Sequence, residues 1–249
     1  MSKQNIFDNE TFFEGYKGIR AREGNANVLF EIPALFSLLP DLKGKEILDL
    51  GCGFGDHCRA FVEKGAVKVT GIDISAKMLE VARQENSDPS ITYLNMPMED
   101  LDDLDGTYDV VISSLAFHYV EDFKGLLGSI YRKTKPGGVF VFSQENPINT
   151  TYGDDDFPRW TKDEEGNKLY VNLANYGSEG RRNSEWFVDG VTKYHRMFST
   201  IVNDLVEAGF TIEKMIEPLP DDEILEKFPA QKDLFHKPDF LVVRSVRRG

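Results

Sequence analysis

The sequence predicts an α/β fold in which a seven-stranded, mostly parallel sheet carries helices on both faces. From Lys45 onward, short apolar runs alternate with amphipathic runs, which is typical of consecutive βαβ units. Two further apolar runs near the C-terminus predict an antiparallel pair, so that the last strand runs against the others. The predicted strands are Glu46–Leu50, Val67–Asp73, Ile91–Leu94, Tyr108–Ser113, Val139–Ser143, Phe210–Glu217 and Phe240–Arg247.

Amphipathic segments between the strands predict the helices. Residues 56–64, 75–84, 123–133 and 200–208 fit this pattern, and Gly209 ends the last of them. The segment 123–133 has the clearest apolar stripe, formed at helical spacing by Phe123, Leu126, Leu127, Ile130 and Tyr131. The sequence Lys135-Pro136-Gly137-Gly138 predicts a turn before the fifth strand, because proline fixes φ and glycine permits positive φ.

Two segments lie outside the alternating pattern. Residues 1–44 predict a helical cap, since Thr11–Glu14 has the form of a capping box and Val28–Leu39 is mostly apolar until Pro40. Residues 144–196 interrupt the alternation with scattered aromatics and glycines, and predict a lid inserted after the fifth strand. We expect both segments to belong to one domain that spans residues 1–249.

Composition favours a cytoplasmic protein that acts on small molecules, as a monomer or homodimer. No apolar run approaches the roughly 20 residues of a membrane-spanning helix, and the start of the chain lacks the layout of a signal peptide. A net charge of −13 disfavours nucleic acid as a partner. The two cysteines, Cys52 and Cys58, are too close in sequence to suggest a disulfide framework, and no metal site is expected.

A glycine-rich turn is the first candidate binding site. Gly51, Gly53 and Gly55 follow an apolar strand and precede a helix, where backbone N–H groups are free to bind a polar ligand. A dinucleotide site would need a glycine at position 56, but Asp56 stands there, and its carboxylate would repel a pyrophosphate.

Two further acids sharpen this prediction. Asp73 ends the second predicted strand about 20 residues after the turn, where such folds present a carboxylate to the hydroxyls of a ribose. Asp49 lies directly before the turn, where it could pair with the ammonium of an amino-acid cofactor. Because NAD has no ammonium, this arrangement favours a different nucleoside cofactor.

Four motifs together resemble the class I S-adenosylmethionine (SAM)-dependent methyltransferases, which have a Rossmann-like fold, and in particular their type 11 group, which includes quinone-biosynthesis methyltransferases. The resemblance spans roughly residues 45–145, and the order and spacing of the motifs agree with the family. The motifs are 46–55 (EILDLGCGFG), 71–75 (GIDIS), 108–111 (YDVV) and 135–138 (KPGG).

The resemblance implies SAM as cofactor and a set of residues that bind it. Gly51, Gly53 and Gly55 would lie against the methionine part, Asp73 would bind the ribose, and Ile74 and Met78 would flank the adenine. Pro97 replaces the acid that often contacts the adenine amine, so Met98 and Glu99 are assigned to that contact. Tyr16 and Arg20 would contact the methionine carboxylate. The predicted set is completed by Asp49, Cys52, Ser113 and Leu115.

Methyl transfer needs alignment of an acceptor and, for a protonated acceptor, a base. His118, which follows the fourth strand, and His195, at the end of the lid, are the two candidate bases; the alternative for His118 is a structural hydrogen bond. His57 would touch the cofactor carboxylate, and His236 is expected at the surface. Five lid aromatics would either wall the acceptor pocket or form a core of the lid: Trp160, Tyr170, Tyr176, Trp186 and Phe187.

Three functions are compatible with these residues. The first is a methyltransferase that acts on a small-molecule acceptor. The second is a nicotinamide-dependent oxidoreductase on the same sheet architecture, which the residue at position 56 disfavours. The third is a SAM-binding protein without turnover, because no residue of the sequence is uniquely catalytic.

Overall fold

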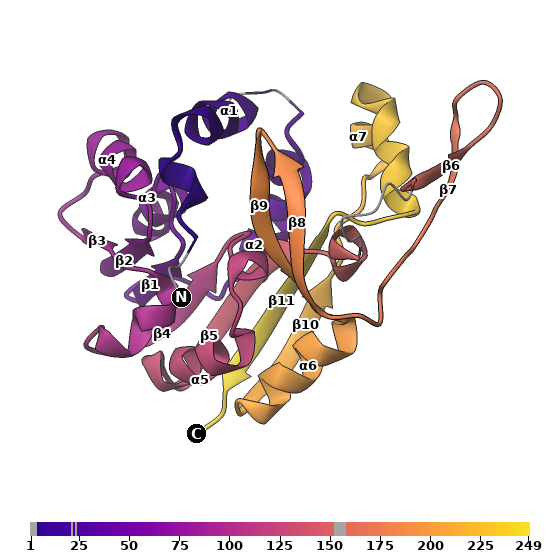
Figure 1. Cartoon of the computed structure of the whole chain (residues 1–249). Coiled ribbons are helices and arrows are strands. Elements are labelled where there is room, and N and C mark those ends of the chain that lie inside the picture. The colour runs from indigo at the N-terminus through magenta and orange to yellow at the C-terminus, as the bar shows by residue number, and fades with distance from the viewer. Residues whose placement is uncertain (1–3, 21, 23, 152–157) are drawn as a thin grey trace.

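The computed structural model describes residues 4–20, 22, 24–151 and 158–249. These residues form a seven-stranded sheet with the strand order β10-β11-β5-β4-β1-β2-β3, and helices surround it (Figure 1). The strands are β1 (Glu46–Leu50), β2 (Lys68–Asp73), β3 (Ile91–Asn95), β4 (Tyr108–Ser113), β5 (Thr134–Glu145), β10 (Phe210–Ile216) and β11 (Phe240–Arg247).

Strand directions agree with the predicted fold. The pairs β1–β2, β1–β4, β2–β3 and β4–β5 are parallel, whereas β11 is antiparallel to both of its neighbours, β5 and β10. The mostly parallel sheet with its last strand antiparallel is therefore confirmed.

Helices cover both faces of the sheet because its strand residues alternate in direction. Leu48 and Leu50 of β1 join a core with α5 and α6, while Ile47 joins a second core with α2, α3 and α4. The apolar stripe predicted on α5 is buried as expected, except that Tyr131 is only partly buried. The helices are α2 (Ile32–Ser37), α3 (Asp56–Glu63), α4 (Ala76–Glu85), α5 (Phe123–Lys133) and α6 (Phe198–Glu207).

The predicted turn before the fifth strand is instead an irregularity inside β5. Thr134 pairs with Tyr108 of β4, and Val139 pairs with Val110, so four residues of β5 bulge out between these two pairs. Gly137 has a φ of +76°, which a glycine adopts without strain. The proline and glycines therefore interrupt the ladder but do not delay the start of the strand.

The N-terminal segment is helical, with boundaries that differ from the predicted ones. Helix α1 (Glu10–Arg20) begins before Thr11, and Asn9 caps it by accepting a hydrogen bond from the Phe12 N–H at 3.1 Å. The apolar run that was predicted as one helix consists of a π-helical turn, η2 (Asn27–Glu31), which continues into α2. A short 3-10 turn, η1 (Ile6–Asp8), precedes α1.

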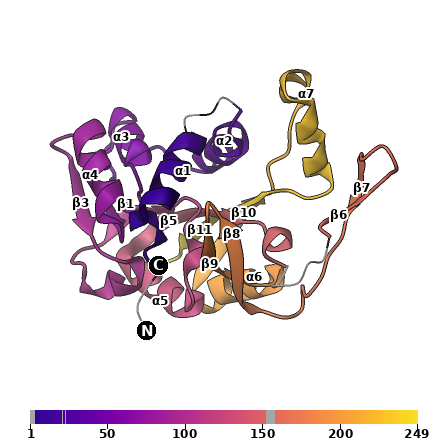
Figure 2. The same cartoon turned by 45° about the horizontal axis from the view of Figure 1, so that its top comes forward.

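The predicted lid is two separate hairpins rather than one cover. Strands β6 (Trp160–Lys162) and β7 (Lys168–Val171) form a hairpin that projects away from the sheet beside α7 (Asp222–Lys227) in both views (Figures 1 and 2). Strands β8 (Gly180–Trp186) and β9 (Val188–His195) form the second hairpin, which reaches α1. Residues 152–157 of the predicted lid lie outside the described residues.

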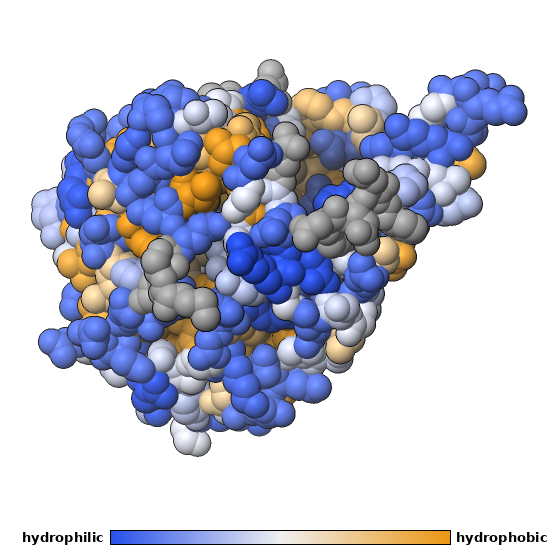
Figure 3. All heavy atoms as spheres, in the orientation of Figure 1, coloured by the Kyte–Doolittle hydropathy of each residue, from blue (hydrophilic) through white to orange (hydrophobic). Residues whose placement is uncertain are grey.

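Hydrophilic side chains cover most of the face shown in Figure 3, and the most hydrophilic of them gather over the hairpin β8–β9, which carries Arg181 and Arg182. Across the described part of the chain, no helix has the length and apolar character that crossing a bilayer requires.

Candidate functional site

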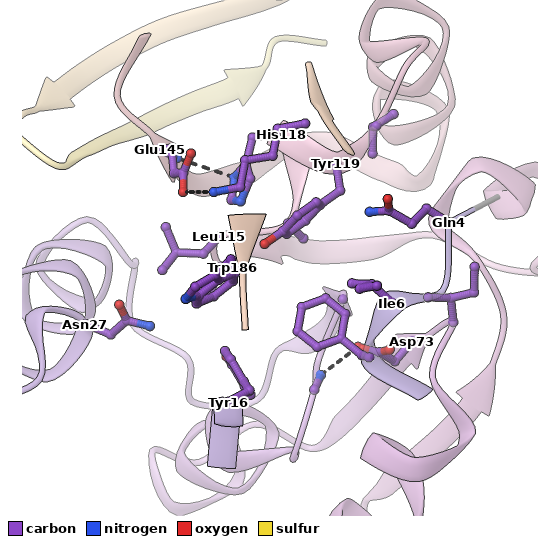
Figure 4. Close-up of a pocket in the computed structure, with 18 of the residues that line it drawn as sticks. Gln4, Ile6, Tyr16, Asn27, Asp73, Leu115, His118, Tyr119, Glu145 and Trp186 are labelled. Atoms are coloured by element: carbon purple, nitrogen blue, oxygen red, sulfur yellow. Dashed lines mark hydrogen bonds and ion pairs between the residues drawn. The ribbon is translucent and has the colours of Figure 1, made fainter. Parts of the chain in front are cut away.

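A cavity of about 640 Å³ opens at the carboxyl edge of the sheet. Its walls come from the residues that directly follow β1, β2, β3 and β4, from the end of β5, and from α1 and the hairpin β8–β9. Figure 4 shows the side chains from these separate elements pointing toward one space. This is the edge at which open α/β sheets bind their ligands.

The glycine turn forms one wall of the cavity. Gly51 and Gly53 line it, with φ values of +73° and +54°. A Cβ on Gly53 would meet no atom within 4 Å, so the backbone there is open to close approach by a ligand. Gly55 lies behind this wall as the left-handed N-cap of α3, where a Cβ would strike the Tyr93 hydroxyl, and it does not line the cavity.

Asp73 is held in a fixed orientation at the cavity wall. One of its oxygens accepts the Gly53 N–H at 2.8 Å (Figure 4), and the other accepts the Ser75 N–H at 2.8 Å. Burial raises the pKa of Asp73 despite these two hydrogen bonds. Each carboxylate oxygen keeps a second lone pair for a ligand hydroxyl, as the predicted ribose contact requires.

The predicted adenine residues line the same end of the cavity. Ile74 and Met78 follow β2. Met98 and Glu99 follow β3, and the two residues before them, Met96 and Pro97, also line the cavity. An apolar slot with one acid at its rim suits a flat base that carries an amine.

Two buried acids lie close behind this wall. Asp49 is 1% exposed, accepts a hydrogen bond from Cys58 Sγ at 3.4 Å, and has a second oxygen without a partner among the described residues. Burial raises its pKa to about 7. Glu31 is fully buried, accepts from Ser114 and Ser143, and also has one oxygen without a described partner. Asp49 does not line the cavity, so the structure does not place it for the predicted direct contact with an ammonium.

Of three other residues predicted to bind the cofactor, two line the cavity and one does not. Cys52 and Leu115 line the cavity, and Leu115 has a positive φ of 52°. Ser113 does not, because its hydroxyl is buried and donates to the Leu50 carbonyl at 2.8 Å; its neighbour Ser114 lines the cavity instead.

Helix α1 places Tyr16 and Arg20 on the cavity. Arg20 forms an ion pair with Asp56, so the acid that replaces a glycine of the dinucleotide motif holds this guanidinium. His57 lines the cavity beside them, is half-buried, and packs against the rings of Phe36 and Phe61. Its Nε2 has no partner among the described residues, and burial lowers its pKa to about 4.

His118 lies at the opposite end of the cavity from Asp73 (Figure 4). The Glu145 N–H donates to its Nδ1 at 3.4 Å. Since a backbone N–H can only donate, Nδ1 is the accepting nitrogen, and the neutral ring carries its proton on Nε2. Burial lowers the pKa of His118 to about 4. At neutral pH the ring is therefore uncharged and offers an N–H donor.

Glu145 and Lys193 form an ion pair at 2.5 Å beside His118. The side chains are 24% and 14% exposed, respectively. Burial raises the pKa of Glu145, but its basic neighbours outweigh that effect, and its pKa lies below the usual range. Glu145 is thus a carboxylate at neutral pH and a weak proton acceptor.

His195 is not part of the cavity wall. Its Nδ1 is 2.8 Å from the Thr150 hydroxyl, its Nε2 is 2.9 Å from the Tyr176 carbonyl, and the residue is fully buried. Both ring nitrogens are therefore engaged, and His195 fastens the end of β9 to the body, in place of its predicted role as a base. His236 is exposed, as predicted.

Of the five aromatic residues predicted for the lid, one lines the cavity and the others lie elsewhere. Trp186 lines the cavity, stacks on Phe187 at 5.3 Å and packs edge-on against Phe12 of α1. Phe187 itself fits against α1 because residue 15 is a glycine, whose absent Cβ would overlap its ring. Trp160 and Tyr170 are on the projecting hairpin, and Tyr176 packs against His195, so none of these three lines the cavity.

One part of the wall was missed by the sequence analysis. Gln4 exchanges two hydrogen bonds with the backbone of Thr192, at 3.2 and 2.8 Å. Asn5 donates to the Ile74 carbonyl at 3.3 Å, and Asp8 accepts from the Ser75 hydroxyl at 2.6 Å. The segment before α1 thus links the hairpin β8–β9 to the start of α4 and closes this side of the cavity.

Comparison with known proteins gives consistent matches. A family model described as a methyltransferase domain matches residues 48–142. A SAM-dependent methyltransferase from Mesorhizobium loti is 40% identical over 87% of this chain and 97% of its own, with a TM-score of 0.78. A putative SAM-dependent methyltransferase from Listeria monocytogenes is 37% identical over 88% of this chain and 97% of its own, with a TM-score of 0.79.

A more distant match concerns only part of each chain. The malonyl-[acyl-carrier protein] O-methyltransferase of Pectobacterium atrosepticum is 37% identical over 44% of this chain and 42% of its own length. This chain thus aligns with less than half of that enzyme.

Proposed function

Because this chain belongs to the family of SAM-dependent methyltransferases, we propose that it transfers the methyl group of SAM to a small-molecule acceptor held at the His118 end of its cavity. The observation that carries the proposal is one continuous cavity, whose lining runs from Asp73 and the glycine turn to His118 and Glu145. Cofactor and acceptor would meet inside it, away from bulk water.

The residues at the Asp73 end suit SAM. Three acids, Asp56, Asp73 and Glu99, and one base, Arg20, line this end among the described residues. Behind the wall, Asp49 and Glu31 each have one buried oxygen without a partner among the described residues. SAM bears a sulfonium and an ammonium against one carboxylate, so an acidic environment with a single guanidinium complements its charge.

When bound, SAM supplies a methyl group on a sulfonium sulfur, which leaves as a neutral thioether when the acceptor forms its bond to the methyl carbon. The chain has to align the acceptor with that methyl group and exclude water. Alignment of this kind is worth up to about 7–11 kcal/mol of the barrier in well-oriented cases. Trp186 and Tyr119 line the cavity and provide flat walls for this purpose.

His118 has a specific part in this proposal. Its Nε2–H donates a hydrogen bond to the acceptor and so orients it, because Nδ1 is already occupied by the Glu145 N–H. This role replaces that of a general base, for which its pKa of about 4 is poorly suited at neutral pH. The oxygen acceptor of the Pectobacterium relative, an O-methyltransferase, supports an oxygen atom as the acceptor here.

The test follows the methyl group. The protein is incubated with SAM labelled in its methyl group and with a cell extract separated into small-molecule, protein and nucleic-acid fractions. The proposal predicts label in the small-molecule fraction with the wild-type protein, and at least tenfold slower labelling with Asp73→Ala at a SAM concentration below saturation. Label confined to protein or nucleic acid would refute a small-molecule acceptor.

A further inference from the structure

Charge is distributed unevenly along the cavity. At the end away from Asp73, four basic side chains and two acidic ones line the wall among the described residues: Arg159, Arg182, Lys193, Lys237, Glu145 and Asp239. The whole chain has a net charge of −13, so a basic lining contrasts with the molecule around it. Counted over the described lining residues, acidic side chains are in excess at the Asp73 end and basic side chains at the other end.

The two lysines at this end form ion pairs with described residues, whereas Arg182 does not. Lys193 pairs with Glu145 at 2.5 Å, and Lys237 pairs with Asp239 at 2.8 Å. Arg182 donates to three backbone carbonyls, those of Arg181, Asn175 and Ser178, and makes no ion pair with a described residue. Its Nε is buried and has no hydrogen-bond partner among the described residues. Arg182 thus brings to the acceptor end a positive charge that has no counter-charge among the described residues.

The hairpin β8–β9 places this charge next to the other groups of the site. Arg182 and Lys193 are directly opposite each other in the β8–β9 ladder, so both side chains leave the same face of the hairpin. Lys193 forms an ion pair with Glu145, and the Glu145 N–H donates to His118 Nδ1. The Nε2–H of His118 is another hydrogen-bond donor. The donors of this wall therefore include a guanidinium, an ammonium and an imidazole N–H.

The site also offers no strong base. Nδ1 of His118 already accepts a hydrogen bond, and Glu145 is held as a weakly basic carboxylate by its ion pair. A neutral hydroxyl or an ammonium acceptor would have to lose a proton before or during methyl transfer. The charged group of an anionic acceptor has already lost its proton, so methyl transfer to that group needs no base.

The geometry points to an acceptor that carries an anionic group, a carboxylate or a phosphate, bound by Arg182 and Lys193 at the His118 end of the cavity. This inference rests on the proposed function and names the substrate class for the same site. The planar guanidinium of Arg182 is suited to either anion.

Four probes with the same ring test the inference by calorimetry on protein saturated with S-adenosylhomocysteine: benzoate, phenyl phosphate, benzamide and benzylamine. We expect benzoate or phenyl phosphate to bind more tightly than benzamide by about tenfold or more, as a charge-assisted hydrogen bond allows. The tighter of the two anions identifies the source as carboxylate or phosphate.

Matched variants assign the effect to the site. Arg182→Gln should weaken anion binding about tenfold, and Arg182→Lys should restore part of it. Arg181→Gln removes the same charge from the adjacent position, which is exposed and does not line the cavity, and should leave binding unchanged. Unchanged binding of S-adenosylhomocysteine shows that each variant is folded.

Three results would overturn the inference: benzamide or benzylamine binding as tightly as the anions, neither anion binding to the loaded protein, or equal losses in the Arg181 and Arg182 variants. Failure of the proposed function looks different, because the methyl label would then appear in a macromolecular fraction whatever the probes do.

Discussion

Asp49→Asn should stabilise the protein at alkaline pH although it changes a residue of the cofactor motif. Asp49 is 1% exposed, its only described hydrogen bond comes from Cys58, and one of its oxygens has no described partner. A carboxylate in that position is poorly solvated, whereas a neutral amide of the same shape has no charge to desolvate.

The pKa of Asp49 gives the magnitude. Burial raises this pKa from its usual 3.8 to about 7, and that difference corresponds to about 4 kcal/mol in the free energy of unfolding. Between these two pH values the folded state binds more protons at Asp49 than the unfolded state does. The contribution of Asp49 to stability is therefore present below pH 3.8 and is lost as pH rises through about 7.

Urea unfolding at a series of pH values between about 5 and 8 checks this prediction. The stability of Asp49→Asn relative to wild type should increase with pH and level off above the folded-state pKa. Asp109→Asn is the control, because hydrogen bonds from the Glu46 N–H and Lys135 outweigh burial and hold the pKa of Asp109 below its usual value. This variant should be less stable than wild type by an amount that does not change over this pH range. A pH-independent difference between Asp49→Asn and wild type would refute the reasoning.

The other predictions concern the turn and the two ends of the cavity. Gly55→Ala should cost about 2–4 kcal/mol in unfolding free energy, from its left-handed backbone and the overlap with the Tyr93 hydroxyl, and Tyr93→Phe should recover part of that cost in a double-mutant cycle. Asp73→Ala should weaken SAM binding at least tenfold in a calorimetric titration, and retained affinity would argue against the ribose contact. His118→Ala should lower turnover with little change in SAM affinity, and full activity of the variant would remove His118 from the mechanism. Because the pKa of His118 is about 4, the pH profile of the wild-type rate should show no histidine inflection near pH 6.5.

The features that the sequence predicted well are those that short segments encode. The apolar stripe of α5 and the apolar runs of β1 and β4 match the observed elements at both ends. Gly53 and Asp73 were assigned to one binding site from the spacing between the turn and the second strand, and the hydrogen bond of 2.8 Å between them agrees with that assignment.

The features that it missed depend on contacts between distant segments. Gln4 and Thr192 are 188 positions apart, and no local pattern marks their pairing. Glu31 accepts hydrogen bonds from Ser114 and Ser143, and only the folded chain brings these three residues together. His195 resembled a base in sequence, but partners on either side of its ring show that it holds β9 in place.

We propose that one cavity holds SAM at its Asp73 end with the sulfur directed toward His118. A crystal structure with S-adenosylhomocysteine bound tests it most directly. We expect ribose hydroxyls within hydrogen-bond distance of the Asp73 carboxylate and a sulfur that faces the space between Tyr119, His118 and Lys193. A ribose that does not contact Asp73, or a sulfur that faces away from His118, would contradict it.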